Sequence, residues 1–166
     1  AAAHFGEEPC ITGSRGSGAV FFSGCSLSCV YCQNEEISQR YHGVEITVPR
    51  LRKIFAELVA LGAHNINLVN PTHFAPAIAE ALERPLPVPV VYNCSGYESV
   101  STLRLLEGKI QVYLPDYKYA LAEPALLYSQ VPDYPQVAAL AIKEMFRQRG
   151  AYQFDDAGLL QSGVLI

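Results

Sequence analysis

The sequence has no long apolar run and no block of basic residues, and each absence excludes a class of protein. No apolar run approaches the roughly 20 residues that span a bilayer, although half of the 166 residues are apolar. The twelve Lys and Arg residues are scattered, with no block of five or six, and the net charge is −4. We therefore expect no membrane span and no nucleic-acid or anionic-membrane surface.

Familiar catalytic motifs are also missing. No Ser/His/Asp constellation and no paired carboxylates stand out in the sequence. The glycine-rich stretch TGSRGSG, residues 12–18, precedes a predicted strand and lacks the Gly-Lys-Ser/Thr of a Walker motif, so we interpret it as a structural linker. A chain of this length can bury one sizeable core, which predicts a single domain over residues 1–166.

Cysteine occurs in an odd number, five, which argues against a complete disulfide framework. Cys10 and Cys94 stand apart, and we expect both to be reduced thiols that pack as small hydrophobes. The other three, Cys25, Cys29 and Cys32, fall within eight positions of the stretch GCSLSCVYCQN. Clustered thiols with two spare ones fit a reducing compartment, which predicts a cytoplasmic protein.

Strand-like and helical patterns alternate along most of the chain. Residues 1–17 read as a loop, and Gly18 leads into the β-prone run AVFF. Further strands are expected at 65–70, 88–93 and 110–114, and helices at 48–61, 74–82, 98–106, 120–130 and 135–149. This alternation predicts an α/β fold built from βαβ units, a partial (βα) barrel of the TIM type with parallel strands.

The last residues, AYQFDDAGLLQSGVLI, predict a hairpin that turns at 155–158. The chain then stops on three apolar residues, before enough βα units have accumulated for an eight-stranded barrel. We therefore expect a domain that is truncated at its C-terminus and belongs to a longer protein.

Polar or unusual residues follow four of the predicted strands. They are Gly24-Cys25, Asn70-Pro71-Thr72-His73, Asn93-Cys94-Ser95-Gly96 and Pro115-Asp116-Tyr117-Lys118. Ligands of parallel α/β folds gather at the carboxyl ends of the strands. We expect these four segments to converge on one rim.

The cysteine cluster allows three interpretations. A structural zinc site would take a fourth ligand from Cys10, His4 or His42, but only one C-x2-C pair exists. A redox CxxC does not account for Cys25. An iron–sulfur cluster usually has four cysteine ligands, so three would leave one iron open for chemistry.

The spacing C-x3-C-x2-C, with Tyr31 before the last cysteine and Gln33-Asn34 after it, resembles the signature of radical S-adenosylmethionine (SAM) enzymes. The resemblance implies that the three cysteines bind a [4Fe–4S] cluster whose fourth iron is chelated by SAM. It further implies reductive cleavage of SAM to a 5′-deoxyadenosyl radical, which abstracts a hydrogen atom. It places Tyr31, Gln33 and Asn34 among the cofactor-binding residues.

Residues 13–130 resemble more closely the pyruvate formate-lyase activating enzymes. Asn70-Pro71-Thr72-His73 stands where those enzymes carry a Gly-Gly-Glu motif for the amino group of SAM, so the resemblance assigns cofactor contacts to Asn70, Thr72 and His73. The alternative for His73 is an ordinary helix-start residue.

Two later segments extend this resemblance. Asn93-Cys94-Ser95-Gly96 resembles a segment that begins with an acid in the activating enzymes, and here Asn93 and Ser95 would contact the cofactor. Asp116-Tyr117-Lys118 matches their Asp-Leu-Lys, which implies that Lys118 neutralises the SAM carboxylate and that Asp116 organises the site or a monovalent cation. The alternative for the first segment is a turn that supplies a helix N-cap, and the alternative for Asp116 and Lys118 is an ordinary ion pair.

The resemblance also implies partners. In the activating enzymes the substrate is a glycine of a glycyl-radical enzyme, and a flavodoxin or ferredoxin donates the electron. Two other classes stay open from the residues alone: a zinc-stabilised interaction module, and an electron-transfer protein with a cluster but no use for SAM.

Overall fold

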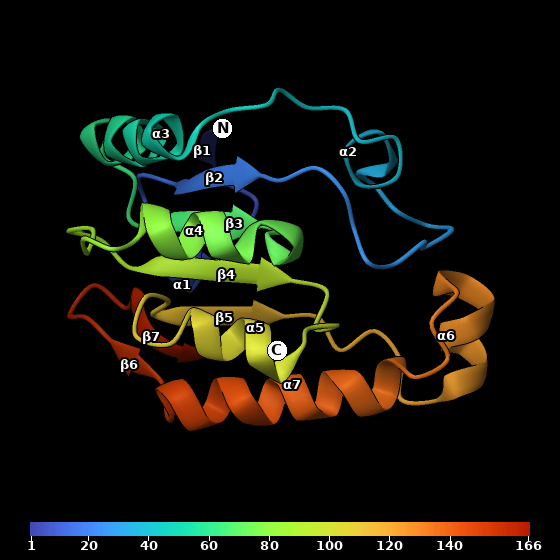
Figure 1. Cartoon of the computed structure of the whole chain (residues 1–166). Helices are drawn as coiled ribbons and strands as arrows, with labels where there is room; N and C mark the ends of the chain where they lie inside the picture. The colour runs from blue at the N-terminus through green and yellow to red at the C-terminus, as the bar shows by residue number, and fades with distance from the viewer.

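The computed structural model describes all 166 residues, which form a seven-stranded sheet flanked by helices (Figure 1). The strands are β1 (Ala2–His4), β2 (Ser17–Phe21), β3 (Ile66–Val69), β4 (Val90–Cys94), β5 (Val112–Pro115), β6 (Gln153–Phe154) and β7 (Leu160–Val164). Their order is β1-β2-β3-β4-β5-β7-β6, with parallel pairing from β2 to β7 and an antiparallel strand at each edge. The predicted α/β class with a parallel core is confirmed. The sheet is open between β1 and β6, so a TIM-type barrel stays a prediction.

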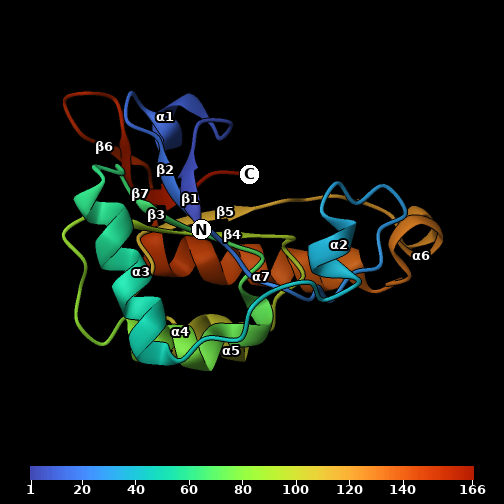
Figure 2. The same ribbon diagram turned by 90° about the horizontal axis from the view of Figure 1, so that it is seen from above.

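The helices lie mainly on one face of this sheet. They are α1 (Pro9–Thr12), α2 (Glu35–Ser38), α3 (Val48–Ala60), the 3-10 turn η1 (Thr72–Phe74), α4 (Ala75–Ala81), α5 (Val100–Leu105), α6 (Ala122–Ser129) and α7 (Tyr134–Arg149). Figure 2 shows α3, α4, α5 and α7 on one side of the sheet and the short α1 on the other. None of the helices combines the length and the apolar character needed to cross a membrane.

The core divides between the two faces of the sheet. The larger part joins strand residues such as Leu68 and Tyr92 to helix residues such as Phe55 of α3 and Met145 of α7, all of them fully buried. On the other face, Ile11 of α1 packs against Val91 and other apolar residues of the central strands. Burial on both faces explains why the parallel strands read as nearly continuous apolar runs.

The prediction that residues 1–17 form a loop was wrong. Ala2–His4 pair antiparallel with Ser17–Ala19 as an edge strand, and Pro9 begins the single turn of α1. Proline is favoured at a first helical position because its missing N–H would have no partner there. The β1 pairing depends on contact with β2, which a run of alanines does not signal locally.

The other predicted elements agree with the structure to within a few residues at their ends. The hairpin at the end of the chain is also confirmed, and Asp155 Oδ1 accepts hydrogen bonds from the backbone of Ala157 and Leu159. Because β2, β3, β4 and β5 are parallel, their carboxyl ends lie at one edge of the sheet, the edge at which α2 and α6 stand (Figure 1). The cysteine loop between β2 and α2 lies at the same edge.

Candidate functional site

A cavity of about 600 Å³ opens at the carboxyl ends of the parallel strands. It collects nearly all of the site residues predicted from the sequence: Cys25, Cys29, Tyr31, Cys32, Gln33, Asn34, Asn70, Asn93, Ser95, Asp116 and Lys118. Thr72 and His73 do not line it. The expected convergence of the four strand ends is therefore seen in the structure.

Each cysteine sulfur of the loop has a hydrogen-bond partner in the protein. Leu27 N–H donates to Cys25 Sγ at 3.4 Å and Ser129 Oγ donates to Cys29 Sγ at 2.8 Å. Ser38 Oγ and Cys32 Sγ lie 3.1 Å apart, and either of them can be the donor. Donors of this kind stabilise negative charge on sulfur and are a means by which proteins tune iron–sulfur clusters. The sulfur environment therefore fits thiolate ligands of a cluster.

The electrostatics of the loop also favour a positively charged group. Burial raises the pKa of the Cys25 thiol, and the neighbouring Cys29 and Cys32 raise it further, against the lowering effect of the Leu27 N–H. The Cys25 thiol therefore does not ionise readily by itself, whereas bound iron would supply the compensating charge. No three Cys, His, Asp or Glu side chains converge on a position for a single ion.

The cysteine loop is held from both sides. Leu27 and Cys29 are buried against Tyr119 and Ala125, and the backbone N–H of Val30 donates to the α6 carbonyl of Tyr128 at 2.9 Å. This packing ties the loop to α6, which precedes the long helix α7 (Figure 1).

On the other side, Asn70 connects the loop to the end of β3. Its Nδ2 donates a hydrogen bond to the carbonyl of Gly24, and its own backbone N–H donates to Asn93 O at 2.8 Å. Asn70 has φ 56°, a left-handed conformation that asparagine tolerates better than most residues. Its side chain can therefore serve as a tether where the chain turns sharply out of the strand.

The ends of β4 and β5 meet at a buried tyrosine. Tyr134 OH lies 2.7 Å from Ser95 O and 2.9 Å from Asp116 O, and it accepts a hydrogen bond from the Lys118 backbone N–H at 2.9 Å. Gly96 has φ 75°, and a Cβ there would collide with the Asp116 carbonyl, so only glycine allows this close approach. Lys118 Nζ then pairs with Asp116 Oδ2 at 2.5 Å on the wall of the cavity.

Thr72 points away from the cavity toward a buried carboxyl group. Its Oγ1 donates to Glu98 Oε1 at 2.5 Å, and Tyr92 OH donates to Glu98 Oε2 at 3.1 Å. Burial raises the pKa of Glu98 to about 7, although these hydrogen bonds lower it. The other residue outside the cavity, His73, lies in η1 close to Gly24.

Sequence reasoning missed several residues that build this site. Glu7 lines the cavity, and Ser38, Ser129 and Tyr134 hold its parts together. Ser129 is 100 positions from the cysteine that it contacts. None of these residues belongs to a local motif, so only their pairing in the fold identifies them.

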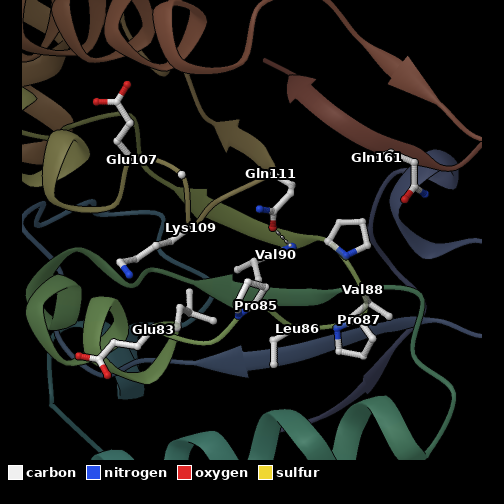
Figure 3. A pocket seen from close by; sticks show the side chains of 13 residues that line it. Glu83, Pro85, Leu86, Pro87, Val88, Val90, Glu107, Lys109, Gln111 and Gln161 are labelled. Carbon is white, nitrogen blue, oxygen red and sulfur yellow. Dashed lines mark hydrogen bonds between the residues drawn. The ribbon is translucent and has the colours of Figure 1, made fainter.

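A second cavity, of about 500 Å³, lies at the amino ends of β4 and β5, opposite the first cavity (Figure 3). It is formed by the segments that lead into β4 and β5, including Pro85, Pro87 and Lys109. Its polar side chains serve the fold, since Gln111 Oε1 accepts a hydrogen bond from Val90 N at 3.0 Å (Figure 3) and Glu107 pairs with Arg147 at 2.8 Å. No residue predicted to act in the site lies there.

Comparison with known proteins places the cysteine cluster within a described type of domain. Residues 12–84 match the family model of a 4Fe-4S single cluster domain. The chain is also 34% identical, over 140 residues, to the uncharacterized protein MJ0674 of Methanocaldococcus jannaschii. That alignment covers 79% of this chain and 40% of the relative, so the chain spans about two fifths of the relative's length. Residues 12–84, with Cys25, Cys29 and Cys32 among them, thus contain a 4Fe-4S cluster-binding domain.

Proposed function

We propose that this chain is the catalytic domain of a radical SAM enzyme. The observation that carries the proposal is that one cavity is lined both by the three loop cysteines and by the polar ends of β3, β4 and β5. An electron-transfer protein would need the cysteines but not the strand-end residues. A cavity of about 600 Å³ is also within the range of small-molecule sites.

In this proposal Cys25, Cys29 and Cys32 hold three irons, and the fourth is left without a thiolate. When bound, a reduced four-iron cluster would supply the one electron needed for reductive cleavage of SAM, which in turn would provide the radical chemistry for removing a hydrogen atom from the substrate. The protein binds, orients and shields the reactants.

The strand ends would orient SAM. Lys118 keeps N–H donors beyond its bond to Asp116, and these would bind the SAM carboxylate, with Asp116 fixing the ammonium group of the lysine or helping to hold a monovalent cation. Asn70, Asn93 and Ser95 present amide and hydroxyl groups to the same cavity. Tyr31, Gln33 and Asn34 border it on the loop side and would contact the rest of the cofactor.

The finer assignment, to the activating enzymes of glycyl-radical enzymes, is part of this proposal. The matching Asp116-Tyr117-Lys118 segment at the end of β5 supports it. A glycine of a partner protein would then give up the hydrogen atom, and a flavodoxin or ferredoxin in the cytoplasm would reduce the cluster. The five free cysteines are compatible with that reducing compartment.

Anaerobic reconstitution with iron and sulfide tests the proposal. We expect four irons per chain, and electron paramagnetic resonance (EPR) of the reduced cluster should change when SAM is added. Dithionite and SAM together should give methionine and 5′-deoxyadenosine. A cluster whose spectrum ignores SAM would identify an electron-transfer module, and a colourless zinc protein would refute the cluster as well.

Cys29→Ala separates the ligand role from folding. We expect the variant to lose nearly all cluster iron because only two loop thiolates remain. Cys10→Ala is the matched control, since Cys10 lies on α1, outside the cavity. Full iron content in Cys29→Ala, measured beside Cys10→Ala and the unchanged protein, would contradict the assigned ligand set.

A further inference from the structure

The residues that follow β3 touch the start of the cysteine loop. We call residues 70–74 the β3 turn. The Asn70 side chain donates a hydrogen bond to the Gly24 carbonyl. The ring centroids of Phe74 and Phe22 lie 5.4 Å apart. Since Gly24 immediately precedes the first loop cysteine, a movement of the β3 turn would move the chain beside a cluster ligand.

The same turn covers a buried carboxyl group. Glu98 is 1% exposed, and its Oε1 accepts a hydrogen bond from Thr72 Oγ1 of the β3 turn at 2.5 Å. From β4, Tyr92 OH donates to Oε2 at 3.1 Å, and the Cys94 side chain adjoins the carboxyl group. His73, the titratable residue of the turn, lies against the start of the cysteine loop instead. Glu98 therefore has hydroxyl and thiol neighbours but no cationic partner.

A buried carboxyl group without a cation favours its neutral form. Burial raises the pKa of Glu98 to about 7, against the lowering effect of its hydrogen bonds. Displacing the β3 turn, which supplies the Thr72 contact, would admit water and bring the pKa back toward its ordinary value of 4.5. The closed turn therefore binds the proton more tightly than an open turn, and a rise in pH shifts the equilibrium toward the open turn.

We propose that Glu98 is a positioning residue whose protonated form keeps the β3 turn closed over it and so holds the cysteine loop, and that loss of the proton loosens both. The inference rests on the part of the proposed function that places a cluster on the loop cysteines. It adds a pH-dependent control of that site and does not require cleavage of SAM.

Amide hydrogen exchange of the reconstituted protein, followed by mass spectrometry at pH 6 and pH 8, tests the inference. Comparing Glu98→Gln with the unchanged protein at each pH cancels the intrinsic effect of pH on exchange. Exchange that is faster in residues 22–34 than in α3 reports local opening rather than global unfolding. We expect this local opening, relative to that of the variant, to rise at least about threefold from pH 6 to pH 8, within a limit of about tenfold for full exposure of the carboxyl group.

Two further variants complete the test. Glu80→Gln is the matched control, because Glu80 is an exposed carboxyl group of α4, the helix that follows the β3 turn. It should exchange like the unchanged protein at both pH values. Thr72→Val keeps the shape of the side chain and removes the donor to Glu98, so residues 22–34 should exchange about two- to tenfold faster already at pH 6.

Equal pH dependence in Glu98→Gln and the unchanged protein would overturn the inference, and so would a Thr72→Val loop that exchanges no faster. Iron content is measured on the same samples. A chain that binds no iron loses the proposed function, and the inference with it. A chain that binds four irons but has equal pH dependence in both proteins loses only the role assigned to Glu98.

Discussion

At the scale of single residues, a chain of hydroxyl groups leads from a cysteine sulfur to the surface. Ser129 donates to Cys29 Sγ, Tyr119 OH lies 2.7 Å from Ser129 Oγ, and Tyr31 OH lies 2.5 Å from Tyr119 OH. Ser129 is fully buried, whereas Tyr31 is about half exposed. The sulfur of Cys29 therefore has a fixed donor whose own hydroxyl is positioned by a neighbour.

Removing that donor is expected to make the cluster harder to reduce. The reduced cluster is the more negative state, so a hydrogen bond to its sulfur ligand stabilises it more than the oxidised state. A typical net hydrogen bond of about 0.5–1.5 kcal/mol corresponds to about 20–60 mV for one electron. Ser129→Ala should lower the midpoint potential by up to that amount in an EPR-monitored redox titration.

The control for this change is Ser28→Ala, because Ser28 is exposed on the same loop and its side chain makes no hydrogen bond. Its potential should match that of the unchanged protein. An unaltered potential in Ser129→Ala, at full iron content, would show that this hydroxyl has no influence on the cluster.

The site residues that could be predicted belong to local sequence patterns, whereas those that were missed reach the site through contacts between distant segments. The spacing of Cys25, Cys29 and Cys32 is local, and so is their position after a strand. Glu7 and Ser129 reach the cavity only because distant segments pack together, which no short pattern encodes. The side-chain direction of Thr72 depends on Glu98, 26 positions away, and was equally beyond local reasoning.

At the scale of secondary-structure elements, the end of β3 determines where the cysteine loop sits. Asn70 combines a left-handed backbone with the hydrogen bond to Gly24. Both features lie at the first residue beyond the strand. The register of β3 in the sheet therefore determines the position of the cysteine loop.

Two substitutions at this position separate backbone strain from the tether. Asn70→Gly keeps the left-handed conformation and loses the hydrogen bond, whereas Asn70→Ala loses both. We expect alanine to be the less stable of the two by about 1 kcal/mol in urea unfolding, with reduced iron content in both. Equal stability of the two variants would show that the backbone at this position is not strained.

The elements themselves were predictable where periodicity is strong. The helix α3 repeats apolar residues at helical spacing, begins with Pro49 in its first turn and ends before Gly62, which has φ 92°. The edge strand β1 and the single turn α1 are too short to carry a period. They depend on pairing with β2 and on the burial of Ile11, both tertiary effects.

At the scale of the whole molecule, alternation of strands and helices predicted the α/β class and the common edge at which the strands end. It did not predict how the N-terminal segment covers the second face of the sheet (Figure 2). This N-terminal segment contains Glu7, which lines the cavity. Predicting the segment as a loop therefore affected both the predicted fold and the predicted site.

A buried carboxyl group should also give the whole molecule a pH-dependent stability. The pKa of Glu98 is raised from 4.5 to about 7 in the folded state. Between these values the unfolded chain has already released the proton that the folded chain keeps, so the free energy of unfolding falls as the pH rises. At about 1.4 kcal/mol per pH unit, the loss is about 3 kcal/mol by pH 7.

Glu98→Gln removes this titration, and urea unfolding at pH 5 and pH 8 measures its effect. Comparing the two proteins cancels the other titrating groups. We expect the unchanged protein to lose more stability than the variant between these values. The same pH dependence in both would place the pKa of Glu98 near its ordinary value.

Val30 and Tyr31 stand between two of the loop cysteines, and both side chains are more than half exposed. Cys32 itself is only partly buried, so a cluster that it holds would lie near the surrounding water. A donor docked on this side of the loop would then reach the cluster by a short path, without an internal relay. Dioxygen would have the same short path, so the exposure that favours reduction of a cluster here also favours its oxidative degradation.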